Sequence, residues 1–168
     1  MSFDSHVRRG HPVIFGLLIF FGIIELAISA WLVSRYNLHR ADRGATERDR
    51  VRFTLFAAIW TVVISIFYLA LFQHSASTGS VATSVMSHLI FLVLTWIIWT
   101  TSAAAVTQML GGGLNCSRGY TYCGQLNALE AFAWIMWILT TFAVIVVIVR
   151  GIKASRRGDG MKGQLVSA

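Results

Sequence analysis

Two acidic residues and one histidine stand inside long apolar stretches of the sequence. Glu25 lies near the middle of one stretch, His88 is a few residues into another, and Glu130 lies close to the start of a third. A charge at the centre of a bilayer costs at least about 2.5 kcal/mol, so a carboxyl there needs a partner or a function. For Glu25 four roles are open: an anchor between helices, a neutral acid bonded to a nearby Ser or Thr, a proton or cation path, and a contact for a lipid headgroup or another subunit.

The other polar residues of these stretches are interpreted as structural. Gln108 could reach Glu130, and the two would form a hydrogen-bonded cap near the outer membrane surface. A lone histidine such as His88 is more often a packing residue than a ligand, although it could pair with Glu25 if their helices are neighbours. The sequence contains no usable order of Ser, His and Asp, no H-E-x-x-H and no phosphate-binding loop. It therefore predicts a protein that is not an enzyme and has no metal and no cofactor, apart from a bound phospholipid or sterol.

Four apolar segments carry these residues, and each is at least 20 residues long: 12–33, 53–72, 85–106 and 126–149. A helix rises about 1.5 Å per residue and the hydrocarbon core is roughly 30 Å thick, so each segment can cross it. Backbone groups in lipid must be satisfied within the segment, which makes the segments helical. The first is longer than the apolar region of roughly 7–15 residues in a signal peptide, so we expect a retained helix.

The predicted fold is thus all-α, an integral membrane four-helix bundle with four spans. Residues 1–11 are expected to form a cytosolic tail, 12–150 the four-span domain and 151–168 a basic cytosolic tail. Hydrophobic residues make up 56% of the 168 residues, and the mean hydropathy is +0.67. The sequence therefore indicates one four-helix unit and no soluble domain.

The net charge of +7 comes from basic residues placed beside the apolar segments. That placement favours contact with lipid headgroups and argues against nucleic acid as a partner. Anionic lipid is expected to contact the basic residues that follow the last segment, which are Arg150, Lys153, Arg156, Arg157 and Lys162.

Charge alone does not orient the chain, because seven of the 14 Lys and Arg lie on each side of the predicted membrane. The loop before the last segment is more informative. Cys116 and Cys123, the only cysteines, share it, and a local disulfide between them would need an oxidising compartment. A glycosylation sequon begins at Asn115. Both features favour an outer location for this loop and cytosolic termini, and two free thiols are the alternative.

Small and polar residues recur at helical spacing in every segment, so each segment has a stripe that can face a bundle interior. We also expect such seams on the outside of the bundle, beside Phe67, Phe91, Trp96 and Trp99, where they would contact lipids and other subunits. The stripes are Gly22, Glu25 and Ser29; Ala57, Thr61 and Ser65; His88, Thr95 and Ser102; and Asn127, Glu130, Trp134 and Thr141.

Two loop-to-helix sequences resemble those of fungal MARVEL-domain tetraspan proteins, to which the non-classical export protein group of fungal plasma membranes is related. RDRVRF (48–53), running into LFAAIWT (55–61), is similar to the second-helix entry of that family, and CGQLNALEAFAW (123–134) to the fourth. The resemblance implies cytosolic termini and paired cysteines in the last outer loop. It also implies work in membrane organisation or vesicle trafficking. The strongly basic first loop departs from the family pattern.

The leading hypothesis is therefore a non-enzymatic organiser of plasma-membrane microdomains or vesicle trafficking that forms homo-oligomers and contacts membrane lipids. The alternative is an oligomeric channel or transporter that uses Glu25 and His88 as its polar path.

Overall fold

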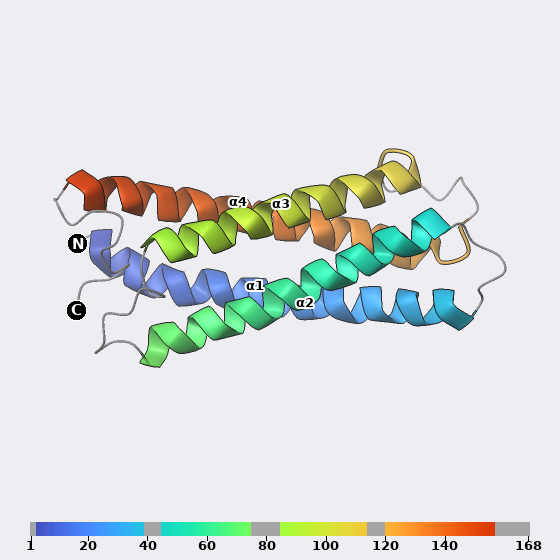
Figure 1. Ribbon diagram of the computed structural model, residues 1–168, viewed down its shortest axis with the longest axis horizontal. Helices are drawn as coiled ribbons and strands as arrows, with labels where there is room; N and C mark the ends of the chain where they lie inside the picture. Colours follow the sequence, from blue (N-terminus) through green and yellow to red (C-terminus); the bar gives the residue numbers. More distant parts are fainter. Residues whose placement is uncertain (1–2, 39–44, 75–84, 114–119, 157–168) are drawn as a thin grey trace.

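The computed structural model describes residues 3–38, 45–74, 85–113 and 120–156. Within these ranges the chain forms four helices and no strand. The helices are α1 (Phe3–Leu38), α2 (Ala45–His74), α3 (Val85–Leu110) and α4 (Cys123–Arg156). They run side by side as an elongated up-and-down bundle, and the start of α1 and the end of α4 lie at the same end (Figure 1). The predicted all-α four-span fold is confirmed.

Each helix contains a segment long and apolar enough to cross a membrane, and these segments are Pro12–Leu38, Thr46–Leu71, Met86–Leu110 and Cys123–Val149. They cover the predicted spans except for residues 72 and 85, and each extends beyond its predicted span at one end. α2 begins at Ala45, ahead of the predicted start at residue 53, and its early turns carry an ion pair between Arg52 and Asp49 at 3.6 Å. α1 begins at Phe3 and so takes in most of the predicted N-terminal tail.

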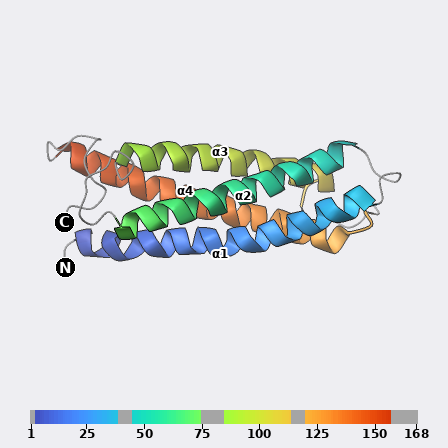
Figure 2. The ribbon, with the colours of Figure 1, turned by 60° about the horizontal axis from the view of Figure 1, so that its bottom comes forward.

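In the bundle α1 packs beside α2, α2 beside α3, α3 beside α4 and α4 beside α1 (Figure 2). Gly22 brings α1 close to its neighbours, because a Cβ atom there would lie 2.8 Å from Val62 Cγ2 and 3.8 Å from Met136 Cε. The first distance is too short for a real contact, so only glycine permits this approach of α1 to α2. At this contact Val62 of α2 and Met136 of α4 lie at the same depth in the bundle as Gly22 of α1.

Three glycines directly follow Leu110, the last residue of α3. Gly111, Gly112 and Gly113 have φ angles of 92°, 93° and 95°, a left-handed conformation that other residues rarely adopt. The amides of Gly111 and Gly112 donate to the Thr107 carbonyl at 3.1 and 3.0 Å, which satisfies a carbonyl at the helix end.

The core consists of three clusters along the bundle axis. Phe15, Tyr68 and Phe91 belong to the cluster nearest the start of α1. The middle cluster is built largely from small residues around Trp99 and comprises Leu18, Ala57, Ala58, Trp99, Ala103, Ala133 and Met136. The third cluster lies at the opposite end and includes Leu32, Val51 and Leu129. Large apolar side chains also cover the outside, as expected when lipid is the solvent.

Candidate functional site

The predicted polar stripes of α1, α2 and α3 all face the bundle interior. Ala57, Thr61 and Ser65 are fully buried, as are Glu25 and Ser29. The expectation that such seams also cover the outside of the bundle is therefore wrong for the α2 seam. Small residues let helices approach closely, and here they lie between the helices of one chain and not between chains.

The aromatic residues expected beside those outer seams divide between the two surfaces. Phe91 and Trp99 are buried, with 5% and 0% of their surface exposed, whereas Phe67 is 55% exposed. Trp96 is half-buried. Only part of the proposed outer aromatic surface is thus available to lipids or other subunits.

The stripe predicted for α4 is only partly buried. Glu130 faces the interior, but Trp134 is 37% exposed. The interior face of α4 instead carries Leu129, Ala133 and Met136. Packing selects this face because Met136 meets α1 beside Gly22.

Glu25 is fully buried, yet neither of its carboxylate oxygens has a hydrogen-bond partner. The nearest polar member of its stripe does not help. The Ser29 hydroxyl donates to the backbone carbonyls of Glu25 and Leu26, at 2.7 and 3.2 Å. The predicted bond between the Glu25 carboxyl and a neighbouring Ser or Thr is therefore not formed in this bundle.

The helix register explains why Glu25 lacks a donor. It follows Gly22 by three residues, about 4.5 Å along the axis. In antiparallel α2 and α4 the same step from Val62 and Met136 leads to the neighbourhood of Ala58 and Ala133, and both alanines are fully buried. The carboxyl thus lies beside the alanine-rich cluster around Trp99, where an unpaired polar group is costly.

His88 lies in an aromatic environment at a different depth. Its ring centroid is 4.5 Å from that of Tyr68 and 6.2 Å from that of Phe15, which it meets edge-on. Phe15 precedes Glu25 by ten residues of α1, which corresponds to about 15 Å along the axis. The structure therefore does not bring Glu25 and His88 together, because they lie at different depths of the bundle.

Glu130, unlike Glu25, takes part in a short chain of hydrogen bonds. The Trp134 indole N–H donates to the Thr107 hydroxyl at 3.0 Å, and that hydroxyl donates to Glu130 Oε1 at 2.7 Å. The partner predicted for Glu130 was Gln108, which instead accepts a hydrogen bond from Arg50 Nη2 at 3.1 Å. The prediction missed by one residue, because consecutive helical residues point about 100° apart and so face different helices.

The mid-span tryptophans follow a rule that the sequence interpretation missed. Their indole N–H groups donate across helix boundaries to threonine hydroxyls: Trp60 to Thr95 (3.1 Å), Trp96 to Thr141 (2.9 Å), Trp99 to Thr61 (2.9 Å), Trp134 to Thr107 (3.0 Å) and Trp137 to Thr100 (2.9 Å). In lipid an indole N–H without an acceptor is costly, so these pairs let Trp pack deep in the span.

Most of the accepting threonines pass the bond on to their own helix. Thr61, Thr95 and Thr100 donate to the carbonyl four residues earlier, each at 2.8 Å, and Thr141 does so at 2.7 Å. A threonine at the same depth as a tryptophan on the next helix is the signal that could have revealed the pairs from the sequence.

The remaining tryptophan, Trp31, lies near the C-terminal end of α1 and has a different environment. It is 37% exposed, and the Arg35 guanidinium lies 5.3 Å from its ring centroid. This arrangement suits the boundary between lipid and water, where a ring and a cation can stack.

Several predicted residues lie beyond what the structure describes. Asn115 and Cys116 lie outside the described residues, so the glycosylation and the disulfide to Cys123 stay predictions. Arg157 and Lys162 lie outside them as well. Arg150, Lys153 and Arg156 belong to α4, but their side chains are not among those described, and contact of this segment with anionic lipid also stays a prediction. In the described part of the chain no group of three or more His, Cys, Asp or Glu could hold a metal ion.

Comparison with known proteins gives one family. The model of the MARVEL family, described as a membrane-associating domain, matches residues 6–146. The match covers nearly all of the four helices and the polar residues described above. No curated protein and no solved structure matches the chain.

Proposed function

Since the chain belongs to the MARVEL family of membrane-associating domains, we propose that it is a non-enzymatic membrane organiser that acts through self-association and lipid contacts. We place it in the plasma membrane, where it would organise microdomains or support vesicle trafficking. The family is a membrane-associating, non-enzymatic kind of domain, which supports this class of function. The narrower resemblance to fungal tetraspan proteins stays a prediction.

The main support is that the polar stripes are buried inside the bundle while its exterior is apolar. Polar stripe residues such as Thr61 and Ser102 are buried. Large apolar side chains face outward, and they include Phe20 (58% exposed), Phe67 (55%) and Phe142 (60%). Such an exterior contacts lipid and other membrane-spanning chains inside the membrane.

Self-association must then use the bulky exterior and not the small-residue seams. The seam of Ala57, Thr61 and Ser65 is closed off inside the bundle. Contacts between copies would be made by outward Phe, Ile and Val side chains, through dispersion and shape. The proposed interface is therefore broader and less specific than a small-residue dimer motif.

The proposed topology has cytosolic termini. It rests on the sequon at Asn115 and on the Cys116–Cys123 pair, both of which would suit an outer loop. A protease-cleavable tag at Ala168 should resist protease added to intact cells, and cleavage from outside would reverse the orientation.

Photo-crosslinking in native membranes tests the self-association. A photoreactive phenylalanine analogue replaces outward Phe142 or Phe20, and the matched control replaces Phe15, which is 2% exposed. We expect dimer-sized and larger products from the two outward positions and none from Phe15. Monomer alone at both outward positions, with correct membrane insertion, would reject the proposal.

An oligomeric channel is the second candidate, because the Glu25 carboxyl is buried without a hydrogen-bond partner. The axial separation of Glu25 from His88, about 15 Å, weakens this candidate. Proton flux through liposomes that contain the purified protein decides between the two. Flux that is abolished by Glu25→Gln would favour the channel, and flux no greater than in empty liposomes would leave the organiser.

A further inference from the structure

Arg50 is held at the junction of α2 and α3, close to one end of both helices. Its Nη1 donates to the Ala105 carbonyl at 2.8 Å and its Nη2 to Gln108 Oε1 at 3.1 Å. A guanidinium carries five N–H groups, so further donors stay available after these two bonds. The two bonds fix the position of a cation close to where the apolar span of α2 begins.

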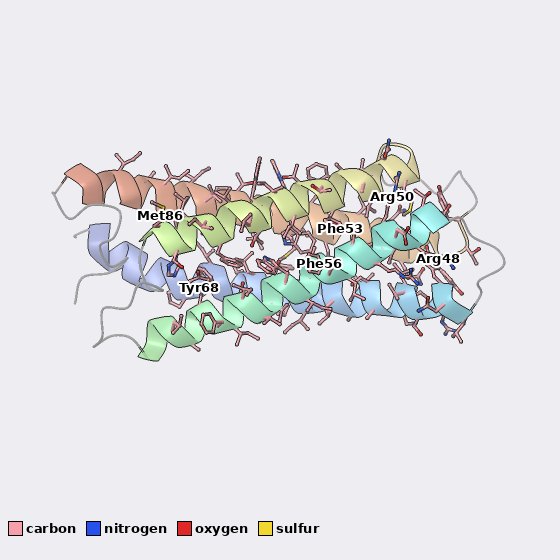
Figure 3. All side chains as sticks on the ribbon, in the orientation of Figure 1. Arg48, Arg50, Phe53, Phe56, Tyr68 and Met86 are labelled. Carbon is pink, nitrogen blue, oxygen red and sulfur yellow. The ribbon has the colours of Figure 1, made fainter. Side chains whose placement is uncertain are left out.

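An aromatic strip continues from Arg50 along the same side of α2. The ring centroids of Phe53 and Phe56 are 6.2 Å apart, those of Phe56 and Trp60 are 6.3 Å apart, and the interplanar angles are 36° and 34°. Phe56 is 50% exposed, and Phe53 and Trp60 are half-buried. Figure 3 shows Arg50, Phe53 and Phe56 following one another along α2, from its end toward the middle of the bundle.

Beside Arg50 the neighbouring turns of α3 carry small or polar side chains. Ala105 and Gln108, which both contact Arg50, lie on one face with Thr101. Thr101 is exposed, and its hydroxyl is bonded to its own helix at the Ile97 carbonyl, 2.9 Å away. The rings of Phe53, Phe56 and Trp60 are partly exposed, so a linear apolar chain can contact them from the lipid side.

From these contacts we infer that the face formed by Arg50, Phe53, Phe56 and Trp60 binds one glycerophospholipid, with its phosphodiester at Arg50 and an acyl chain along the three rings. This inference rests on the proposed function, in which lipid contacts are part of the activity. It adds the site and the class of lipid.

Charge and length select this occupant. Arginine binds phosphate oxygens through charge-assisted hydrogen bonds, and a sterol has no phosphate to offer. Arg50 and Trp60 are ten residues apart, about 15 Å along the helix, which is half of a hydrocarbon core of roughly 30 Å. The strip thus extends across one leaflet, the depth that an acyl chain reaches below its headgroup. Because every glycerophospholipid has a phosphodiester, the inference does not depend on which leaflet this end of the bundle faces.

Arg52 provides the internal contrast. It lies two residues further along α2, and it donates to Asn37 Oδ1 at 3.1 Å and pairs with Asp49 at 3.6 Å. An acidic partner thus compensates the charge of Arg52. Both hydrogen bonds described above for Arg50, in contrast, go to neutral acceptors, so an anion would still gain from its charge.

Native mass spectrometry of the full chain, released from mild detergent, tests the inference. The test variants are Arg50→Gln and Phe56→Ala. The matched controls are Arg52→Gln and Phe142→Ala, which alters a phenylalanine on α4 that is 60% exposed. We expect one retained phospholipid on the unaltered protein and on both controls. Arg50→Gln should lose roughly tenfold in retention, because it removes the charge-assisted hydrogen bonds to the phosphodiester. Phe56→Ala should also lose retention, because it removes the central ring of the strip.

Equal retention by all four variants, or equal loss in all four, would overturn the inference, because either result means that lipid is held without this face. Competition supplies a second measurement on the unaltered protein. Added phosphatidylcholine or phosphatidylethanolamine should displace the bound lipid, whereas a sterol or inorganic phosphate should not. Displacement by the sterol would also overturn the inference.

The same variants separate this site from the proposed function. Crosslinking through the analogue at Phe20 should proceed in Arg50→Gln as in the unaltered protein. Loss of retained lipid with normal crosslinking supports the lipid site and leaves self-association intact. Retention without any crosslinking would reject self-association and leave the lipid site standing.

Discussion

Among the described residues two acidic side chains are buried, Glu25 and Glu130, and they differ in their surroundings. Their exposed fractions are 0% and 3%. Glu130 accepts a hydrogen bond from Thr107, which in turn accepts one from Trp134. Neither carboxylate oxygen of Glu25 has a hydrogen-bond partner. The same chemical group is thus part of a polar network at one level of the bundle and isolated at another.

The difference follows from what faces each carboxyl. Glu130 lies opposite the last turns of α3, where Thr107 offers a hydroxyl. Glu25 lies deeper, level with the alanine-rich part of the core around Ala58 and Ala133. A stripe of polar residues therefore predicts burial of an acidic side chain, but it does not predict a donor. Four mutations test how far this contrast extends.

Replacement of Glu25 by leucine should stabilise the bundle. Leucine has a similar size and removes a buried polar group that lacks a partner, which is worth about 2 kcal/mol. Unfolding in mixed micelles of mild detergent and dodecyl sulfate would measure the change. Glu25→Gln, which keeps an unpaired polar group, is the control and should show little gain. A marked loss of stability in Glu25→Leu would mean that the carboxyl has a partner after all, such as a water molecule.

Replacement of Gly22 by alanine should weaken the contact that positions Glu25. The new methyl group would lie 2.8 Å from Val62 Cγ2, and overpacking of this kind costs roughly 1–3 kcal/mol. The same unfolding assay applies, and Val62→Ala in the same chain should recover most of the loss. Gly16→Ala is a matched control on α1, because a Cβ atom there meets nothing within 4 Å. Equal losses at both glycines would point to a general effect of the substitution.

Replacement of Glu130 by leucine should have the opposite sign to the change at Glu25. It removes the acceptor of the Thr107 hydroxyl, and one such bond in a membrane protein is worth about 1 kcal/mol. Glu130→Gln keeps an acceptor oxygen and should retain most of the stability. If Glu130→Leu proves stabilising, the contrast between the two carboxyls would fail.

Replacement of Thr100 by valine should have the smallest effect. It removes the acceptor of the Trp137 indole N–H, a pair that does not involve an acidic residue. The average cost of losing such a bond is about 0.6 kcal/mol. Thr101→Val is the control, since that hydroxyl bonds only its own helix at the Ile97 carbonyl. Tryptophan fluorescence should change in Thr100→Val and not in Thr101→Val.

The sequence alone determined the four membrane-spanning helices. The reason is that lipid imposes two local conditions, a run of apolar residues of sufficient length and a backbone that satisfies its own hydrogen bonds. The inward stripes of α1, α2 and α3 were also predictable, because a helical period places Gly22, Glu25 and Ser29 on one face.

Only the tertiary structure decided which side chain meets which. Thr107, and not Gln108, reached Glu130, because a difference of one residue turns a side chain by about 100° toward another helix. Glu25 and His88 were both buried as expected, yet they lie at different depths, which depends on the stagger of the helices. The buried face of α4 followed from the approach of Met136 to α1 at Gly22. These outcomes depend on the rotation and axial offset of one helix against another, and apolar segments that all satisfy the same lipid conditions carry little local information about either.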